Sequence, residues 1–137
     1  MSAVKELIRT EQNGTISFGD YTLDVKAKLQ DYDFKGDLYK VKTYRDITKL
    51  ERNGMFVYES VPGTAVNEFA ADDTGVCFTV EGTQDAQITL GLSDDSEYDV
   101  LIGSEDTGIM KTNRSGKLTL SVELSEGASA VVEVKKR

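Results

Sequence analysis

Residues 118–124 read Leu-Thr-Leu-Ser-Val-Glu-Leu, with an apolar side chain at every second position. Successive side chains of a β-strand point to opposite faces, so this period of two predicts a strand with one buried face and one solvated face. Residues 21–30, 88–92 and 98–102 show the same alternation. The one helical candidate, residues 2–9, is short, and we expect a strand there. The pattern predicts an all-β protein built from antiparallel sheets.

Turn signals separate these runs and divide the chain into many short strands. Asn13-Gly14 and Asn53-Gly54 are pairs typical of tight hairpins, and the stretches around them, residues 11–18 and 51–58, resemble each other. Lys35-Gly36-Asp37 predicts a further hairpin. Short strands with regular turns are typical of β-sandwiches and barrels.

A change in composition occurs near Pro62, the one proline of the chain. Nine of the eleven aromatic residues precede residue 70, and most of the net negative charge follows it. We therefore expect two small antiparallel halves, sandwich-like or barrel-like, joined by a short linker. An aromatic-rich hairpin subdomain would span residues 1–62 and an acidic sandwich subdomain residues 63–137. The pattern leaves open whether these halves are separate domains.

The charge balance bears on partners and metals. The 137 residues include 16 Lys and Arg against 24 Asp and Glu, a formal net charge of −8, and no Lys or Arg lies between residues 71 and 110. Such a surface repels phosphate backbones, so we expect no nucleic-acid partner. Asp94, Asp95, Glu97 and Asp99 offer oxygen ligands for calcium, but the spacing of a calcium loop is missing. We expect solvated turn acids, with no metal and no cofactor.

The residue types needed for common catalytic sites are scarce. The chain has no histidine and a single cysteine, Cys77, so a zinc site, a serine triad and an activated thiol all lack their usual groups. Paired carboxylates for glycoside hydrolysis remain open, although the chain has no tryptophan to stack on sugar rings. We expect a protein that is not an enzyme.

The N-terminal residues indicate a location. Charge appears at Lys5 and Glu6, so no apolar signal core follows the first methionine, and no apolar run approaches 18 residues. We expect a cytoplasmic protein that does not insert into membranes.

Two stretches, residues 14–23 and 50–63, resemble a family of short proteins of the Clostridia that carries the name endosialidase. Residues 104–108, Ser-Glu-Asp-Thr-Gly, fit the opening of the sialidase Asp-box, but Ile109, Met110 and Lys111 depart from its Thr-Trp continuation. The five arginines are scattered along the sequence, whereas a sialidase site needs several together for the substrate carboxylate. We expect residues 104–108 to be a turn and the resemblance to imply fold rather than catalysis.

The C-terminal part is similar to small β-sandwich modules appended to carbohydrate-active and surface proteins. Residues 98–103 and 111–122 carry this similarity, which implies a spacer or binding unit without chemistry of its own. The expected function is a non-catalytic binding or self-assembling structural protein, and the alternative is a carbohydrate-recognition module that binds glycans without hydrolysis.

The aromatic residues of the N-terminal half suggest an interface. A core of that size has little room for nine aromatic side chains, and tyrosine is enriched at protein interfaces. We expect a homo-oligomer, and a glycan or another protein is the alternative partner. The contacts between subunits would lie around the Lys35-Gly36 turn, at Tyr32, Phe34, Tyr39 and Tyr44.

Overall fold

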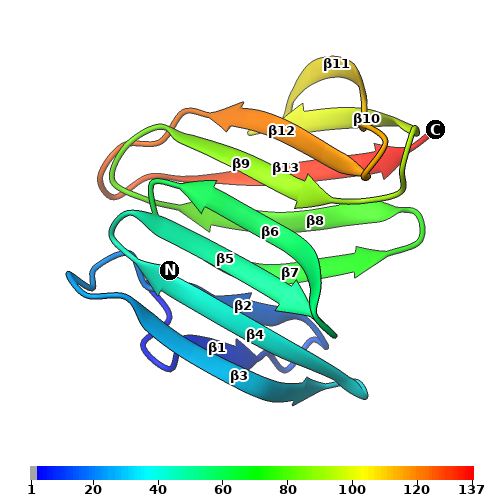
Figure 1. The fold of residues 1–137 in the computed structure, drawn as a ribbon. Helices are drawn as coiled ribbons and strands as arrows, with labels where there is room; N and C mark the ends of the chain where they lie inside the picture. The colour runs from blue at the N-terminus through cyan, green and yellow to red at the C-terminus, as the bar shows by residue number, and fades with distance from the viewer. Residues whose placement is uncertain (1–2) are drawn as a thin grey trace.

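The structure, a computed structural model that describes residues 3–137, consists of two packed layers of antiparallel strands (Figure 1). In spatial order, the seven-stranded sheet contains β1 (Ile8–Thr10), β2 (Ile16–Phe18), β7 (Ala65–Asp72), β8 (Gly75–Glu81), β13 (Ser129–Lys136), β10 (Glu97–Ile102) and β11 (Glu105–Lys111). The six-stranded sheet contains β12 (Lys117–Val122), β9 (Ala86–Gly91), β6 (Met55–Val61), β5 (Ile47–Arg52), β4 (Asp37–Tyr44) and β3 (Ala27–Phe34). The expected all-β sandwich is confirmed.

The alternation at residues 118–124 has the predicted consequence. Leu118, Leu120 and Val122 of β12 are buried between the sheets, whereas the residues between them are exposed. β12 pairs with β9 in regular register, with Leu118 opposite Leu90. Each such apolar side chain removed from water contributes roughly 1.5–3 kcal/mol.

Strands from both sides of Pro62 contribute to each sheet. In the seven-stranded sheet β2 pairs with β7, and in the six-stranded sheet β6 pairs with β9. Pro62 lies between β6 and β7, where the chain passes from one sheet to the other. One hydrophobic cluster includes buried residues from both sequence halves. The two halves therefore share a single core.

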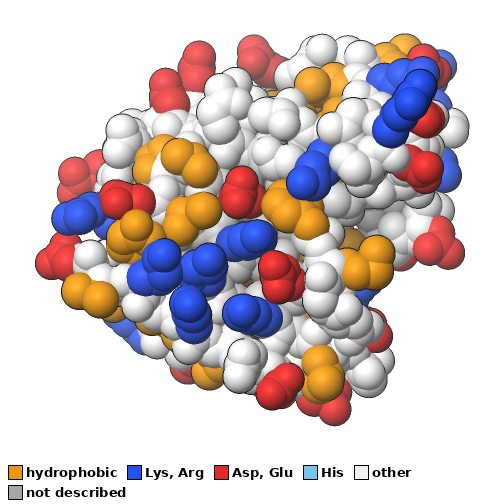
Figure 2. Space-filling view, in the orientation of Figure 1, with side chains coloured by type: hydrophobic (Ala, Val, Ile, Leu, Met, Phe, Trp, Pro, Cys, Tyr) orange, Lys and Arg blue, Asp and Glu red, His pale blue; other side chains and the backbone are white. Residues whose placement is uncertain are grey.

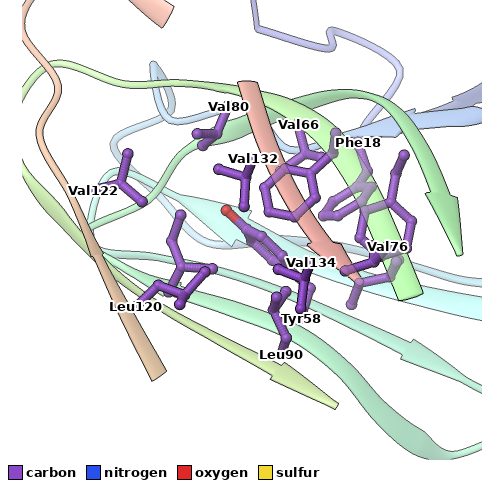
Figure 3. Close-up of a cluster of buried hydrophobic side chains, with 14 of the residues drawn as sticks. Phe18, Tyr58, Val66, Val76, Val80, Leu90, Leu120, Val122, Val132 and Val134 are labelled. Atoms are coloured by element: carbon purple, nitrogen blue, oxygen red, sulfur yellow. The ribbon is translucent and has the colours of Figure 1, made fainter. Parts of the chain in front are cut away.

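Four aromatic rings form the centre of that core. The ring of Phe18 lies 5.3 Å from that of Tyr58 and 5.6 Å from that of Phe69, measured between centroids. Phe78 completes the set, at 5.7 Å from Tyr58 and 5.6 Å from Phe69. Three of these contacts are edge-to-face, a favourable arrangement of aromatic quadrupoles. Figure 3 shows Phe18 and Tyr58 within a continuous apolar cluster that includes Leu120 and Val132.

The strand expected at residues 21–30 begins later than predicted and extends to Phe34. It begins at Ala27, and Val25 is 78% exposed rather than buried. The Asp20 carboxylate accepts hydrogen bonds from the backbone N–H and the hydroxyl of Thr22, which folds residues 20–22 into a turn. Alternation of apolar residues alone did not reveal this local competitor of the strand.

The two Asn-Gly hairpins differ. Asn53 and Gly54, with φ of 52° and 78°, have the positive values of a type I′ turn between β5 and β6. Gly14 has a φ of 82°, but the turn between β1 and β2 spans more residues, closed by a hydrogen bond from the Glu11 N–H to the Thr15 carbonyl. The predicted hairpin at Lys35-Gly36 joins β3 and β4.

Residues 104–108 are only partly a turn. Gly103 and Ser104 form the turn after β10, while residues 105–108 belong to β11, so the expectation of a turn throughout was wrong. A β-bulge occurs here, and the Thr107 hydroxyl donates to the Val100 carbonyl at 2.9 Å. Within residues 3–137, no helix is long and apolar enough to cross a membrane.

Candidate functional site

The outer surface of the six-stranded sheet carries a concentration of positive charge. On β4, Tyr39, Val41 and Thr43 point into the sandwich, so the residues between them point to solvent. The same alternation places lysines on the outer surfaces of β3 and β5. We define the lysine face as Lys26, Lys28, Lys40, Lys42 and Lys49. Figure 2 views this sheet from outside and shows a group of basic side chains over β3, β4 and β5.

Three of these lysines form a row across neighbouring strands. Lys28 lies directly opposite Lys42, and Lys42 lies directly opposite Lys49. Adjacent strands are about 4.8 Å apart, so the three side chains leave the sheet from neighbouring positions. Partial burial, followed by repulsion from the surrounding lysines, lowers the pKa of Lys42. Like charges directly opposite each other destabilise a sheet, so this arrangement costs folding free energy.

Two aromatic rings support the lysine side chains. The ammonium of Lys26 lies 5.7 Å from the ring centroid of Tyr44, and that of Lys49 lies 5.9 Å from the centroid of Phe56. Lys117 of β12 approaches the same Phe56 ring at 4.7 Å. Cations are attracted to the faces of aromatic rings, so both rings orient ammonium groups on this surface.

Hydrogen-bonding side chains continue the row beyond the lysines. Glu59 lies opposite Lys49, Thr89 lies opposite Glu59, and Thr119 lies opposite Thr89. The hydroxyl oxygens of Thr89 and Thr119 are 3.2 Å apart. One line across the sheet thus passes from cations through a carboxylate to hydroxyl groups. We call Thr89 and Thr119 the hydroxyl pair.

Two acidic groups moderate the charge of this surface. Glu51 forms an ion pair with Lys49 at 3.6 Å, and Glu59 is half-buried on the neighbouring strand. The five lysines still exceed these two acids, in a protein of net charge −8. The lysine face is therefore a local basic area on an acidic molecule.

A groove opens at the end of the sandwich where β3 turns into β4 and β7 turns into β8. It encloses about 600 Å³, and Phe34, Tyr39 and Phe69 contribute aromatic surface to it. Lys35 and Arg52 contribute cations. The Asp37 carboxylate accepts a hydrogen bond from the Asn53 side chain in the β5–β6 turn, and the Asp72 carboxylate accepts one from Thr74 in its own turn. A second hollow of about 370 Å³ adjoins it and shares Arg52 and Phe69.

The four residues expected at an interface do not form one surface. Tyr39 is buried, and Phe34 packs edge-to-face against it with ring centroids 6.0 Å apart. The hydroxyl of Tyr32 lies 2.8 Å from the Thr10 hydroxyl, so this ring closes the edge of the sandwich. Tyr44 lies on the opposite surface, beside Lys26. Tyr32, Phe34 and Tyr39 thus contribute to packing within the fold, whereas Tyr44 lies at the lysine face.

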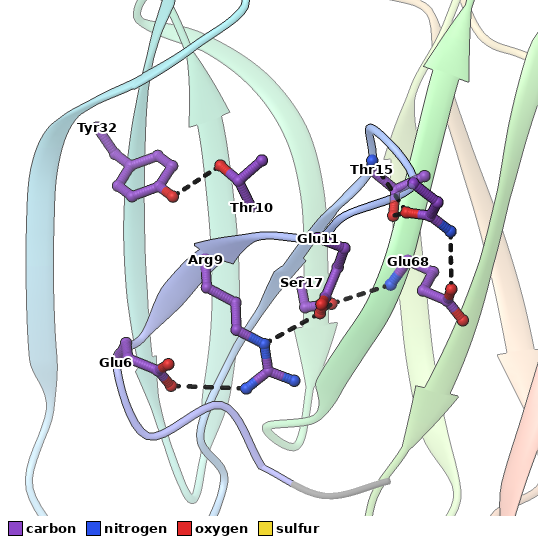
Figure 4. A network of polar contacts seen from close by, with 9 residues as sticks. Glu6, Arg9, Thr10, Glu11, Thr15, Ser17, Tyr32 and Glu68 are labelled. Carbon is purple, nitrogen blue, oxygen red and sulfur yellow. Dashed lines mark hydrogen bonds and ion pairs between the residues drawn. The ribbon is translucent and has the colours of Figure 1, made fainter.

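A polar network fastens the N-terminal hairpin to the sheet (Figure 4). The Arg9 guanidinium donates to the Glu11 carboxylate at 3.0 Å, and Glu11 also accepts from the Ser17 hydroxyl. The Ser17 hydroxyl in turn accepts the backbone N–H of Glu68 at 3.0 Å. The hydrogen bond from Ser17, and then the Arg9 contact, lower the pKa of Glu11. The network connects β1, β2 and β7 and has a structural role.

The remaining sequence candidates lie apart from the lysine face. Cys77 is exposed on the seven-stranded sheet, and partial burial and the charge of Glu133 raise the pKa of its thiol. Its thiol is therefore protonated at neutral pH, which is the less nucleophilic form. Among residues 3–137, no three His, Cys, Asp or Glu side chains gather in a way that could hold a metal ion, the acids of residues 94–99 included.

Comparisons with known proteins gave no match. Neither a scan against protein-family models nor searches of curated proteins and of solved structures found a similar protein.

Proposed function

We propose that the protein is a non-catalytic binding protein that holds an anionic partner on the lysine face. The observation that carries this proposal is the row of Lys28, Lys42 and Lys49 on three adjacent strands. A protein gains no stability from three like charges in register, so a bound anion is the simplest use of the arrangement.

The setting of the row supports this proposal. The protein as a whole is acidic, with a sequence pI near 4.6, so general attraction to anions is weak and binding depends on the local potential. The aromatic rings of Tyr44 and Phe56 reduce the freedom of Lys26 and Lys49. An anion that binds there meets ammonium groups that are already partly ordered.

Cation-exchange chromatography at pH 7 tests this proposal. Despite the net charge of −8, we expect the protein to be retained at low salt through the lysine face. The triple variant with Lys28, Lys42 and Lys49 each changed to Gln should pass through unretained.

A matched control removes the same number of charges elsewhere. Lys111, Lys135 and Lys136 are exposed on the seven-stranded sheet, and their triple change to Gln gives the same net charge. This control should be retained like the unmodified protein. Equal loss of retention in both triple variants would contradict the proposal, because net charge alone would then explain retention.

A second candidate function is carbohydrate recognition without hydrolysis. The hydroxyl pair favours it, because side chains that both donate and accept hydrogen bonds suit the hydroxyl groups of sugars. Titration with neutral and acidic glycans, followed by the intrinsic fluorescence of the tyrosines, tests this candidate. An unchanged signal with every glycan would remove it.

A further inference from the structure

We propose that the partner of the lysine face is a linear acidic polysaccharide that lies across the strands of the six-stranded sheet. This inference rests on the proposed function and names the class of ligand. Its basis is the row that runs from Lys28, Lys42 and Lys49 through Glu59 to the hydroxyl pair.

The row has the dimensions of a polymer site rather than of a single-ion site. It crosses all six strands, and at about 4.8 Å between strands its length is roughly 24 Å. Figure 2 shows this surface as broad and without a deep enclosed hollow over β4 and β5. A chain that presents several groups in succession can use the whole row.

The chemistry of the row changes along its length in a way that suits acidic sugars. The three lysines provide charge for carboxylate or sulfate groups. Glu59 accepts hydrogen bonds from hydroxyl groups, and Thr89 and Thr119 both donate and accept them. On the adjacent row Gln87 donates to the Ser121 hydroxyl at 3.0 Å, so the polar part of the surface is two rows wide. A ligand that carries both anionic groups and many hydroxyl groups satisfies all of these side chains.

Other anionic partners can interact with fewer of the side chains along this row. Nucleic acids and polyphosphates present closely spaced phosphates, so a phosphate comes next to Glu51 and Glu59, where a polysaccharide can place a hydroxyl group instead. An anionic bilayer offers charge to the lysines but no regular array of hydroxyl groups to Thr89 and Thr119. An acidic polypeptide supplies carboxylates alone. The polar half of the row therefore favours the polysaccharide.

The experiment titrates the full chain with four probes of matched length at low and at physiological salt. These are polygalacturonate, hyaluronate, polyglutamate and polyphosphate, with neutral dextran as the uncharged control. Isothermal titration calorimetry should give tighter binding of the two acidic polysaccharides than of polyglutamate or polyphosphate. Equal or tighter binding of polyglutamate or polyphosphate would overturn the inference.

Two variants separate this inference from the proposed function. Thr89→Val with Thr119→Val removes the hydroxyl pair and should weaken acidic-polysaccharide binding about tenfold, a loss of ~1.4 kcal/mol. It should leave cation-exchange retention unchanged, and Thr79→Val on the other sheet should change neither measurement. Normal polysaccharide binding by the double Thr variant overturns the inference alone. Persistent retention of the triple Lys variant overturns the proposed function as well.

Discussion

The hydroxyl of Tyr58 lies 2.8 Å from the hydroxyl of Thr64, although the Tyr58 ring is wholly buried between the two sheets. Thr64 follows the crossover at Pro62, and its hydroxyl also lies 2.8 Å from that of Ser60. A buried phenol requires such a partner, because an unsatisfied polar group in the core is costly. The contact thus connects the aromatic centre of the core to the crossover between the sheets.

Removal of this hydroxyl group should weaken the fold modestly. We expect Tyr58→Phe to lower the free energy of unfolding by about 1 kcal/mol, since the ring and its packing remain. Tyr58→Ala should cost roughly 3–5 kcal/mol, because it leaves a cavity among the aromatic rings. Urea denaturation measures both, with Tyr44→Phe on the outer surface as the control. A similar loss for Tyr58→Phe and Tyr44→Phe would contradict the role given to the buried contact.

The same tyrosine makes the fold sensitive to alkali. Burial raises the pKa of Tyr58, and burial together with the Glu81 contact at 2.6 Å raises the pKa of Tyr21. Both groups are neutral in the folded state, and an unfolded tyrosine ionises near pH 10. The stability that these two neutral tyrosines contribute to the fold is therefore fully present below about pH 10, and it is lost as the pH rises beyond that value. Urea midpoints between pH 8 and 11 should fall above pH 10, and less steeply in Tyr58→Phe.

The lysine row should cost stability that a substitution recovers. We expect Lys42→Gln to raise the free energy of unfolding by about 0.5 kcal/mol, because it removes the central one of three opposed charges. Since the pKa of Lys42 is lowered by folding, stability should also rise as pH increases through the folded pKa toward the unfolded value. Thermal denaturation at low and high salt measures the effect of the charge repulsion, and the same measurement at increasing pH measures the pH dependence. Lys136→Gln is the control. Destabilisation by Lys42→Gln would contradict the prediction that the opposed lysines cost folding free energy.

Neither sequence half should fold alone. The rings of Phe18 and Tyr58 come from residues 1–62, and those of Phe69 and Phe78 come from residues 63–137, so each fragment loses half of the aromatic centre. We expect each fragment to give the circular dichroism of an unfolded chain, and an equimolar mixture to recover β structure. A fragment that shows cooperative thermal unfolding by itself would establish separate domains.

The homo-oligomer remains a prediction, and the structure suggests how to test it. Tyr39 is buried, so Tyr39→Glu would unfold the protein and could not report on an interface. Lys40 is half-exposed on the same strand, and its change to Glu should leave the fold intact while it weakens contact with the acidic surface of a second copy. Light scattering after size exclusion should show an assembly larger than 15.1 kDa that dissociates in this variant. A monomer at tens of micromolar would contradict the prediction.

Periodicity predicted the buried surfaces of the strands but not the lysine face. Lys40 and Lys42 are two residues apart, which indicates a shared outer surface. The Lys35-Gly36 turn, however, sets a register in which Tyr32 opposes Tyr39, and its simple continuation would place Lys28 opposite Thr43. A β-bulge between Leu29 and Tyr32 shifts the pairing by one residue and brings Lys28 opposite Lys42. The residues of the turn give no signal for that bulge, so the row of Lys28, Lys42 and Lys49 could not be predicted from the turn.

The groove and the shared core escaped prediction for a different reason. Both depend on which strands become neighbours across the sandwich, and alternation specifies only which side of a strand is buried. The pairing of β2 with β7 joins residues about fifty positions apart. No local pattern around Ile16 or Phe69 indicates it.

The central position of β13 has a consequence for synthesis of the protein on the ribosome. β13 lies between β8 and β10 and pairs with both, yet it follows both of them in the sequence. Until residue 136 has emerged, β8 and β10 each lack their shared neighbour along one edge. Unpaired strand edges recruit other chains, so nascent copies on neighbouring ribosomes are exposed to misassembly during this interval. Pairing of β13 with its two neighbours closes both edges.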